Sequence, residues 1–165
     1  MTLSSSNSNR NKKGQRFWLL GDTYTFCIEG AETDGKYAVL EISSPPGSKP
    51  PLHSHTKETE GFYVIDGEFS FQYGHDNTMA KPGAFLHLKI GIPHTYKNIG
   101  NSTGRLLFTI IPAGFENFFA EVGILIENEE TFFPPSINTI DITKIVRIAH
   151  ENYGVNIMMP GQEKR

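Results

Sequence analysis

The sequence predicts a mainly β protein with a short C-terminal helical tail. Turn-forming residues are frequent in the 165-residue chain, with 16 Gly and 10 Pro, and they divide it into short segments. The 12 Phe, 6 Tyr and 1 Trp favour strands, because aromatic side chains pack well on a pleated sheet. Apolar residues also alternate with polar ones up to about residue 112, and recur with a helical period after it.

Composition divides the chain into three parts. Residues 1–16 are mainly Ser, Asn, Lys and Arg, with almost nothing to bury, so we expect a disordered N-terminal arm. Residues 17–112 carry the strand pattern and are expected to form a single β-barrel. Residues 113–165 are expected to form a helical extension that packs on this barrel.

Short segments with a strand pattern follow one another in the expected barrel, each closed by turn-forming residues. The Asp66-Gly67 pair between two alternating runs is the strongest hairpin signal, since such pairs favour the tight turns of antiparallel strands. The predicted strands are 17–20, 23–28, 37–42, 52–55, 59–65, 68–73, 84–88, 94–99 and 105–111.

Two helices are predicted after the last strand. The first lies near residues 115–122, where three Phe and one Val recur at helical spacing and Gly123 can end the helix. The second is expected over residues 142–153, because its apolar residues form one face, Asp141 can cap its start and Gly154 can end it.

Composition also excludes several classes of function. The 15 Lys plus Arg against 18 Asp plus Glu give a formal net charge of −3, without the basic patch of a nucleic-acid-binding protein. The chain shows no apolar run long enough for a membrane span and no secretory signal at its N-terminus. Cys27 is the single cysteine, which excludes an intrachain disulfide and suits a reducing compartment. We therefore expect a cytoplasmic protein without nucleic-acid or membrane partners.

Four potential metal ligands lie in the expected barrel. His53 and His55 are two residues apart, which on a strand places both imidazoles on one face, about 6.5 to 7 Å apart at the backbone. Glu60 and His94 come from two other predicted strands. Three imidazoles and one carboxylate suit a divalent transition metal ion such as Fe, Mn, Ni, Co or Zn. An ion that prefers six ligands would keep two positions open for other molecules.

Glycines lie at fixed intervals around these ligands. Residues 47–67 match G-x5-H-x-H-x(3 or 4)-E-x6-G, and residues 83–98 match G-x5-P-x-G-x2-H-x3-N except that Lys89 replaces the proline. These are the two motifs of the cupin superfamily, which the chain therefore resembles. The resemblance implies a jelly-roll, double-stranded β-helix barrel. The matching residues besides the four ligands are Gly47, Gly67, Gly83, Gly91 and Asn98.

Among small single-domain cupins, the helical tail makes this chain most similar to the quercetin 2,3-dioxygenase-like monocupins. The resemblance implies a metal-dependent dioxygenase that acts on a small enol, phenol or dione substrate. His53, His55, Glu60 and His94 would hold the metal, and Glu60 would also act as the catalytic residue that takes a proton from the substrate hydroxyl. A homodimer is implied as well.

Strand alternation also predicts a substrate pocket. Phe62 shares a strand face with Glu60, and Tyr96 shares one with His94, so Phe62 and Tyr96 are candidate walls of a pocket beside the metal. Both would equally suit the packed interior of a small barrel. Glu58 lies two residues before Glu60, which on a strand would place both on the same face, so Glu58 is an alternative ligand. The spacing to the following motif glycine, Gly67, favours Glu60.

Two other functions remain open at this point. The first is a non-catalytic small-molecule-binding or sensor cupin, in which the metal holds a ligand or the fold. The second is a metal-dependent isomerase that acts on a keto-sugar. His75 and His150 lie outside both motifs and are expected to be solvated.

Overall fold

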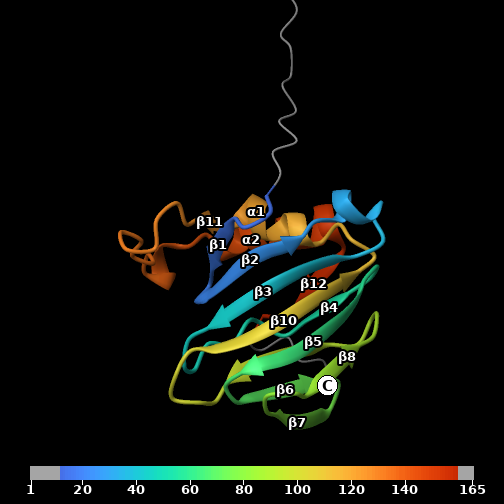
Figure 1. Cartoon of the computed structure of the whole chain (residues 1–165). Helices are drawn as coiled ribbons and strands as arrows, with labels where there is room; N and C mark the ends of the chain where they lie inside the picture. Colours follow the sequence, from blue (N-terminus) through green and yellow to red (C-terminus); the bar gives the residue numbers. More distant parts are fainter. Residues whose placement is uncertain (1–11, 160–165) are drawn as a thin grey trace, which may run out of the picture.

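The computed structural model describes residues 12–159, which form two antiparallel β-sheets packed face to face with two α-helices at one end (Figure 1). In spatial order the larger sheet contains β11 (Ile124–Leu125), β1 (Arg16–Leu19), β2 (Asp22–Ile28), β3 (Ala38–Ser44), β10 (Gly104–Ile111), β5 (Thr59–Asp66) and β8 (Phe85–Leu88). The smaller sheet contains β12 (Val155–Ile157), β4 (His53–His55), β9 (His94–Asn98), β6 (Phe69–Tyr73) and β7 (Asp76–Ala80). The helices are α1 (Glu116–Val122) and α2 (Ile142–Tyr153), with short 3₁₀ turns η1 (Gly30–Thr33) and η2 (Ile137–Thr139).

This architecture confirms the prediction of a mainly β, jelly-roll protein with a helical tail. Every predicted strand and helix is present in the described residues, with ends that differ by one or two positions. The sequence pattern did not predict β7, β11 or β12. Four of the five residues of β7 are exposed, so it has no apolar alternation, and β11 and β12 are only two and three residues long.

The predicted N-terminal arm lies only partly within the described residues. Residues 1–11 fall outside them. In the remaining part, the Gly14 N–H donates to the Phe26 carbonyl at 2.7 Å, and Arg16 begins β1. Pairing with β2 thus starts before residue 17, because backbone hydrogen bonds need no apolar side chains.

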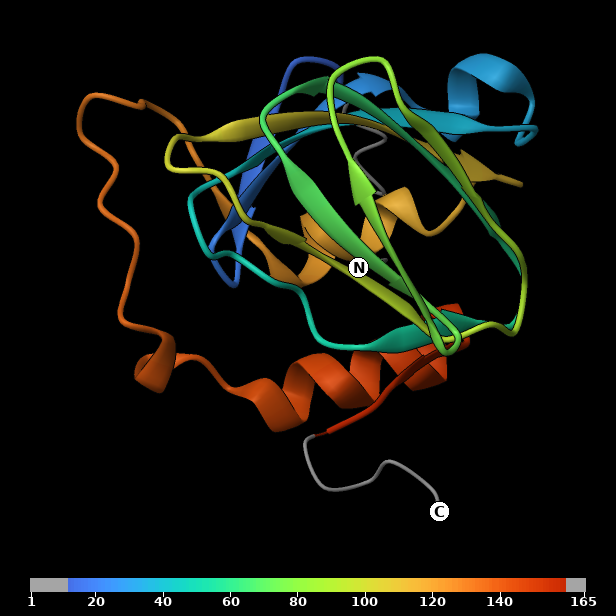
Figure 2. The ribbon, with the colours of Figure 1, turned by 90° about the horizontal axis from the view of Figure 1, so that it is seen from below.

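The core lies between the two sheets and is built by strand alternation. On β3, Ala38, Leu40 and Ile42 are fully buried, whereas the residues between them are partly exposed. Leu40 pairs with Phe108 and Ile42 with Leu106 of the neighbouring β10, and all of these side chains point inward. Seen along the space between the sheets, α1 lies at its far end (Figure 2).

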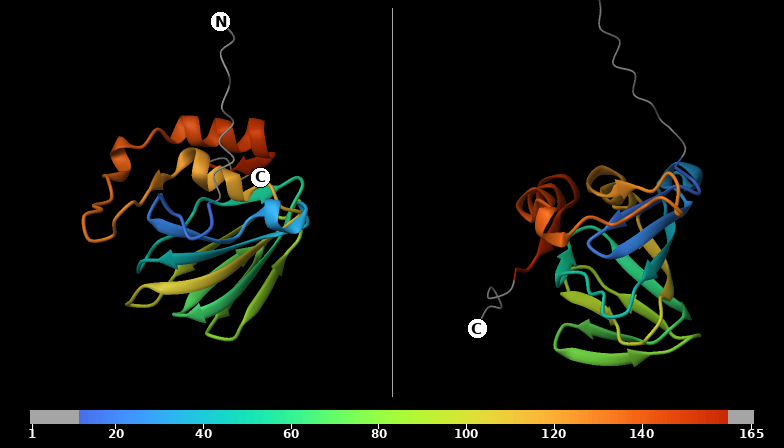
Figure 3. Two further views of the ribbon diagram at one scale, coloured as in Figure 1. Left: turned by 45° about the horizontal axis from the view of Figure 1, so that its top comes forward. Right: turned by 90° about the vertical axis from the view of Figure 1, so that its left-hand side faces the viewer.

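The C-terminal extension covers this end of the barrel and adds one strand to each sheet, β11 beside β1 and β12 beside β4 (Figure 3). The Asp141 carboxylate accepts a hydrogen bond from the Lys144 N–H at 2.9 Å and so caps α2. After α2, β12 pairs with β4 in a register that sets Val155 opposite His55 and Ile157 opposite His53. The extension therefore supports the strand that carries two of the predicted ligands. Within residues 12–159, no helix has the length and hydropathy to span a membrane.

We expect Gly67→Ala to destabilise the protein more than Gly83→Ala. The two glycines have φ angles of 88° and 93°, so alanine at either position costs about 1–2 kcal/mol of left-handed strain. A Cβ at Gly67 would also lie 2.8 Å from the Gly104 Cα, whereas nothing lies within 4 Å of a Cβ at Gly83. In urea denaturation, the losses of unfolding free energy should differ by more than about 1 kcal/mol; equal losses would contradict the close approach at Gly67.

Candidate metal centre

Four side chains from three strands meet between the sheets. His53 and His55 lie on β4, Glu60 on β5 and His94 on β9, so the cluster joins the smaller sheet to the larger. Each residue offers one ligand atom, and these atoms all lie within 4.8 Å of one another. His55, Glu60 and His94 have exposed fractions of only 1%, 2% and 3%, and His53 is partly buried. The structure thus brings all four sequence-predicted ligands to one point.

Strand geometry explains this convergence. His53 and His55 alternate with Ser54 on β4, and their ring centroids are 5.2 Å apart. His53 is paired directly with His94 across β4 and β9, and these ring centroids are 4.6 Å apart. Glu60 faces them from the opposite sheet, where β5 is held between β10 and β8.

Each histidine uses its Nδ1 to contact a group outside the cluster. A carbonyl oxygen can only accept a hydrogen bond, so a ring nitrogen that bonds to one must carry the proton. The Nε2 of the ring is then directed toward the cluster centre, in the arrangement common among metal-binding histidines. The partners of Nδ1 are the Pro51 carbonyl for His53 (2.8 Å), the Ile92 carbonyl for His94 (3.0 Å) and the Glu58 carboxylate for His55 (3.2 Å).

The atoms at the cluster centre fit a metal ion. His55 Nε2 and Glu60 Oε1 lie 3.0 Å apart, yet neither makes a hydrogen bond, although both are buried. Buried polar atoms rarely stay unpaired. His94 Nε2 lies 2.7 Å from the other carboxylate oxygen, Glu60 Oε2. An ion held by the three imidazoles and Glu60 would satisfy the two unpaired atoms, and this N/O donor set suits a divalent transition metal.

The electrostatics of the cluster also favour a cation. Burial opposes ionisation of Glu60, but His55 and His94 outweigh it and hold the pKa of this carboxyl well below its usual value. Burial likewise lowers the pKa of His55, whereas Glu60 and Glu58 raise it more strongly, to a net value of about 9. The pKa of His53 falls to about 3, through burial and the charge of His94. The carboxylates therefore attract positive charge, which is a proton on His55 in the absence of a metal. A bound metal ion would replace that proton, whereas His53 is already neutral.

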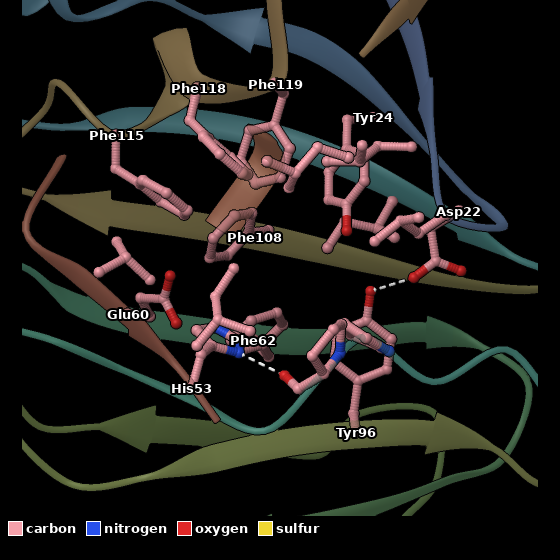
Figure 4. Close-up of a pocket in the computed structure, with 18 residues that line it drawn as sticks. Asp22, Tyr24, His53, Glu60, Phe62, Tyr96, Phe108, Phe115, Phe118 and Phe119 are labelled. Carbon is pink, nitrogen blue, oxygen red and sulfur yellow. Dashed lines mark hydrogen bonds between the residues drawn. The ribbon is translucent and has the colours of Figure 1, made fainter. Parts of the chain in front are cut away.

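A cavity of about 70 Å³ opens beside the cluster, several times the volume that one water molecule needs. His53 and Glu60 line one end of it, and Phe62 and Tyr96, the predicted pocket residues, also line it (Figure 4). The remaining walls are largely apolar. They include Tyr24 from β2, Phe108 from β10, and Phe115, Phe118 and Phe119 at α1.

The sequence patterns did not predict three features of the site. Glu58, considered an alternative ligand, instead contacts Nδ1 of His55 from outside the cluster. The phenylalanines at α1, which predicted a helix by their spacing, also line the cavity. Among them, the Phe115 ring stands edge-on to the His55 imidazole, with ring centroids 4.6 Å apart. Asp22 also lines the cavity, although it falls between the predicted strands 17–20 and 23–28. His75 and His150 are exposed and lie outside the cluster.

Glu58→Gln should weaken metal binding about tenfold. The amide keeps an oxygen near His55 Nδ1 but loses the negative charge, and such outer partners commonly contribute 10- to 100-fold in metal affinity. Competition with a chromophoric chelator measures the change. The control is Glu68→Gln, because Glu68 is an exposed carboxylate whose partner is Lys81 at 3.4 Å. If both variants bound metal equally well, Glu58 would have no part in the site.

Comparisons with known proteins agree with this geometry. The sequence profile of the Cupin domain matches residues 40–110. The chain is 30% identical over 111 residues to quercetin 2,3-dioxygenase of Bacillus subtilis, which covers 67% of this chain and 33% of that protein. It is 34% identical over 67 residues to an oxalate-binding protein of Thermotoga maritima, covering 41% of this chain and 55% of that protein.

A solved structure shows the same similarity. The crystal structure of a predicted oxalate decarboxylase from Thermotoga maritima superposes with a TM-score of 0.54 at 26% sequence identity, covering 55% of this chain and 80% of that one. The matched region of this chain spans a third of the quercetin 2,3-dioxygenase and about half of the oxalate-binding protein. The region matched by the family profile ends at residue 110, before α1, α2 and β12.

Proposed function

The chain is a cupin-domain protein, and we propose that it is a metal-dependent, quercetinase-like dioxygenase acting on a small enol, phenol or dione. The metal would be Fe, Mn, Ni, Co or Zn, held as a divalent ion by His53, His55, Glu60 and His94. The observation that carries the proposal is the convergence of these ligand atoms within 4.8 Å of one another at one end of a cavity. The similarity to quercetin 2,3-dioxygenase over 67% of this chain supports the choice of reaction.

The ion would supply Lewis acidity and a path for electrons between the substrate and O₂. The protein's own side chains then have separate tasks. Glu60 is the carboxylate that lines the cavity beside the histidines, and we assign to it the transfer of a proton from the substrate hydroxyl. Phe62 and Phe108, whose rings stack with centroids 4.7 Å apart, provide a flat apolar wall that would hold a ring and exclude water.

The proposal includes a homodimer in the cytoplasm. Sheets with outer strands such as β7 and β8 present unpaired backbone groups that a second copy can cover. A single cysteine suits a reducing compartment. Size-exclusion chromatography with light scattering would measure the oligomeric state.

The proposed reaction is tested by O₂ consumption. The protein should be purified anaerobically, analysed for metals, reconstituted with each of the five metals and offered a panel of flavonols and 1,2-diones. We expect substrate-dependent O₂ uptake that is lost on chelation and in Glu60→Gln but kept in Glu68→Gln. A protein with stoichiometric metal that consumes no O₂ with any compound of the panel would contradict a dioxygenase.

A non-catalytic binding protein is the second candidate, and the similarity to an oxalate-binding protein favours it. A ligand that raises the melting temperature without being consumed would support this function. The mostly apolar cavity offers few hydrogen-bonding groups to a sugar, which disfavours the keto-sugar isomerase. Solvent deuterium exchange into a substrate without O₂ uptake would identify such an isomerase.

A further inference from the structure

The cavity has a second polar end, away from Glu60 (Figure 4). There the Tyr96 hydroxyl donates a hydrogen bond to Asp22 Oδ2 at 2.6 Å. The Tyr24 hydroxyl interacts with that of Tyr96. All three residues line the same cavity as His53 and Glu60. We call Asp22, Tyr24 and Tyr96 the distal cluster.

The Asp22 carboxyl is an unusual group to find in an apolar wall. Its exposed fraction is 2%, and within residues 12–159 no cationic side chain forms an ion pair with it. Its Oδ1 atom makes no hydrogen bond. Burial raises the pKa of Asp22, although Tyr96, Ser48 and Ser44 partly offset this rise. A buried carboxyl group without a cationic partner destabilises a fold, and such groups concentrate in functional sites.

The backbone holds the distal cluster in place from two sides. Leu20 and Gly21, with φ angles of 51° and 108°, form the turn that sets Asp22 at the start of β2. Leu20 also lines the cavity. Behind Asp22, the side-chain amide of the motif residue Asn98 donates to the Ser44 carbonyl at 2.7 Å and so anchors the neighbouring segment.

An apolar wall separates the two polar ends of the cavity. Tyr96 follows the cluster residue His94 by two residues on β9, so their backbones lie about 6.5 to 7 Å apart along the strand and their side chains share one face. Between the ends, the stacked rings of Phe62 and Phe108 form the wall. The cavity therefore suits a flat apolar ligand with one polar group at each end.

The hydrogen-bonding capacity of the distal cluster indicates which polar group it would take. The hydrogen of the Tyr96 hydroxyl is directed to Asp22, so its oxygen can still accept a hydrogen bond. Tyr24 and Tyr96 both offer hydroxyl groups at neutral pH, because the ordinary pKa of tyrosine is about 10. A ligand hydroxyl can both donate to and accept from such a pair, whereas an alkyl group can do neither.

We propose that the distal cluster binds a hydroxyl group at the far end of a small aromatic ligand whose opposite end carries the oxygens held at the metal centre. The inference rests on the proposed function for the metal-bound end of that ligand. It makes Asp22, Tyr24 and Tyr96 the residues that select among phenolic compounds.

Two catechols of nearly equal size test this selection. 4-(Hydroxymethyl)catechol and 4-ethylcatechol share the same chelating end and differ only in whether the distal group ends in a hydroxyl or a methyl. Burial in an apolar cavity alone favours the ethyl compound. With the zinc-loaded protein, in which the metal is redox-inert, isothermal titration calorimetry should nevertheless show at least fivefold tighter binding of the hydroxymethyl compound.

The variants Asp22→Asn, Tyr24→Phe and Tyr96→Phe should each reduce this ratio of affinities to about one or below. Tyr63→Phe is the matched control, because Tyr63 is 41% exposed and does not line the cavity. Zinc stoichiometry and melting temperature identify any of the three variants that fails to fold. The remaining variants still test the ratio of affinities for the two catechols.

Three results would overturn the proposal. The first is a wild-type ratio of one or less. The second is an unchanged preference for the hydroxymethyl compound in both Asp22→Asn and Tyr96→Phe. The third is tighter binding of 4-(aminomethyl)catechol than of the hydroxymethyl compound, which would indicate a cation site. Failure of the metal site is distinguishable from all three, because it weakens both catechols equally and leaves their ratio unchanged.

Discussion

His94→Ala should abolish stoichiometric metal binding and lower metal affinity by more than about 100-fold, beyond the loss that follows removal of an outer partner. The substitution removes one of four ligand atoms and leaves Glu60 Oε2 without its contact at 2.7 Å. His53→Ala and His55→Ala should have the same effect, since both contribute an imidazole to the cluster. Elemental analysis of anaerobically purified protein and competition with a chelator measure the loss.

The controls for this experiment are His75→Ala and His150→Ala. Both side chains are exposed and lie outside the cluster, so both variants should bind one metal ion per chain, as the wild type does. If His75→Ala lost metal as completely as His94→Ala, the assignment of ligands would be wrong.

Phe108→Ala should lower the unfolding free energy by about 3–5 kcal/mol, the usual cost of removing a buried phenylalanine. Phe108 is 2% exposed on β10, and its ring stacks on that of Phe62 with an interplanar angle of 15°. Since whole domains are stable by about 5–15 kcal/mol, the loss would be a large part of the total. Urea denaturation monitored by tryptophan fluorescence measures it.

Leu107→Ala is the matched control, because Leu107 is the preceding residue of the same strand and is partly exposed on the opposite face. We expect it to cost about 1 kcal/mol or less. Similar losses in the two variants would show that the interior does not lie on the Phe108 side of β10.

Part of the candidate metal cluster could be predicted from short-range rules, whereas Glu60 and His94 were joined to His53 and His55 by the spacing of the two family motifs. Alternation on a strand sets His53 and His55 on one face whatever surrounds them. The Asp66-Gly67 pair fixes the hairpin after β5, and Gly67 does adopt the left-handed φ of 88° that such a turn requires. Together these local rules also yielded most strand positions to within two residues.

The position of Glu58 could not be predicted from strand alternation. Glu58 has the parity of Glu60 but precedes β5, which begins at Thr59. Strand alternation therefore does not apply to it, and its side chain turns to the Nδ1 side of His55. Spacing alone favoured Glu60, which does lie in the cluster, but it could not give the position of Glu58.

Long-range contacts account for the other differences. Asp22 reads as a turn residue beside Gly21, and its burial depends on Tyr96, which lies 74 positions later in the chain. Strand β12 exists because it pairs with β4, about 100 residues earlier. Strand β7 differs, since it pairs with its chain neighbour β6 and was missed because four of its five residues are exposed. The helical spacing around Phe115 predicted α1 but not the contact with His55. Such contacts arise only once the chain is folded, so no local pattern encodes them.

The most direct test of the proposed metal centre is a crystal structure of the protein loaded with Mn(II) or Co(II), with anomalous scattering data collected at the absorption edge of the metal. We predict one anomalous peak per chain, about 2.0–2.3 Å from the Nε2 atoms of His53, His55 and His94 and from a Glu60 carboxylate oxygen. A metal peak located elsewhere, or none at this cluster in protein that contains stoichiometric metal, would contradict it.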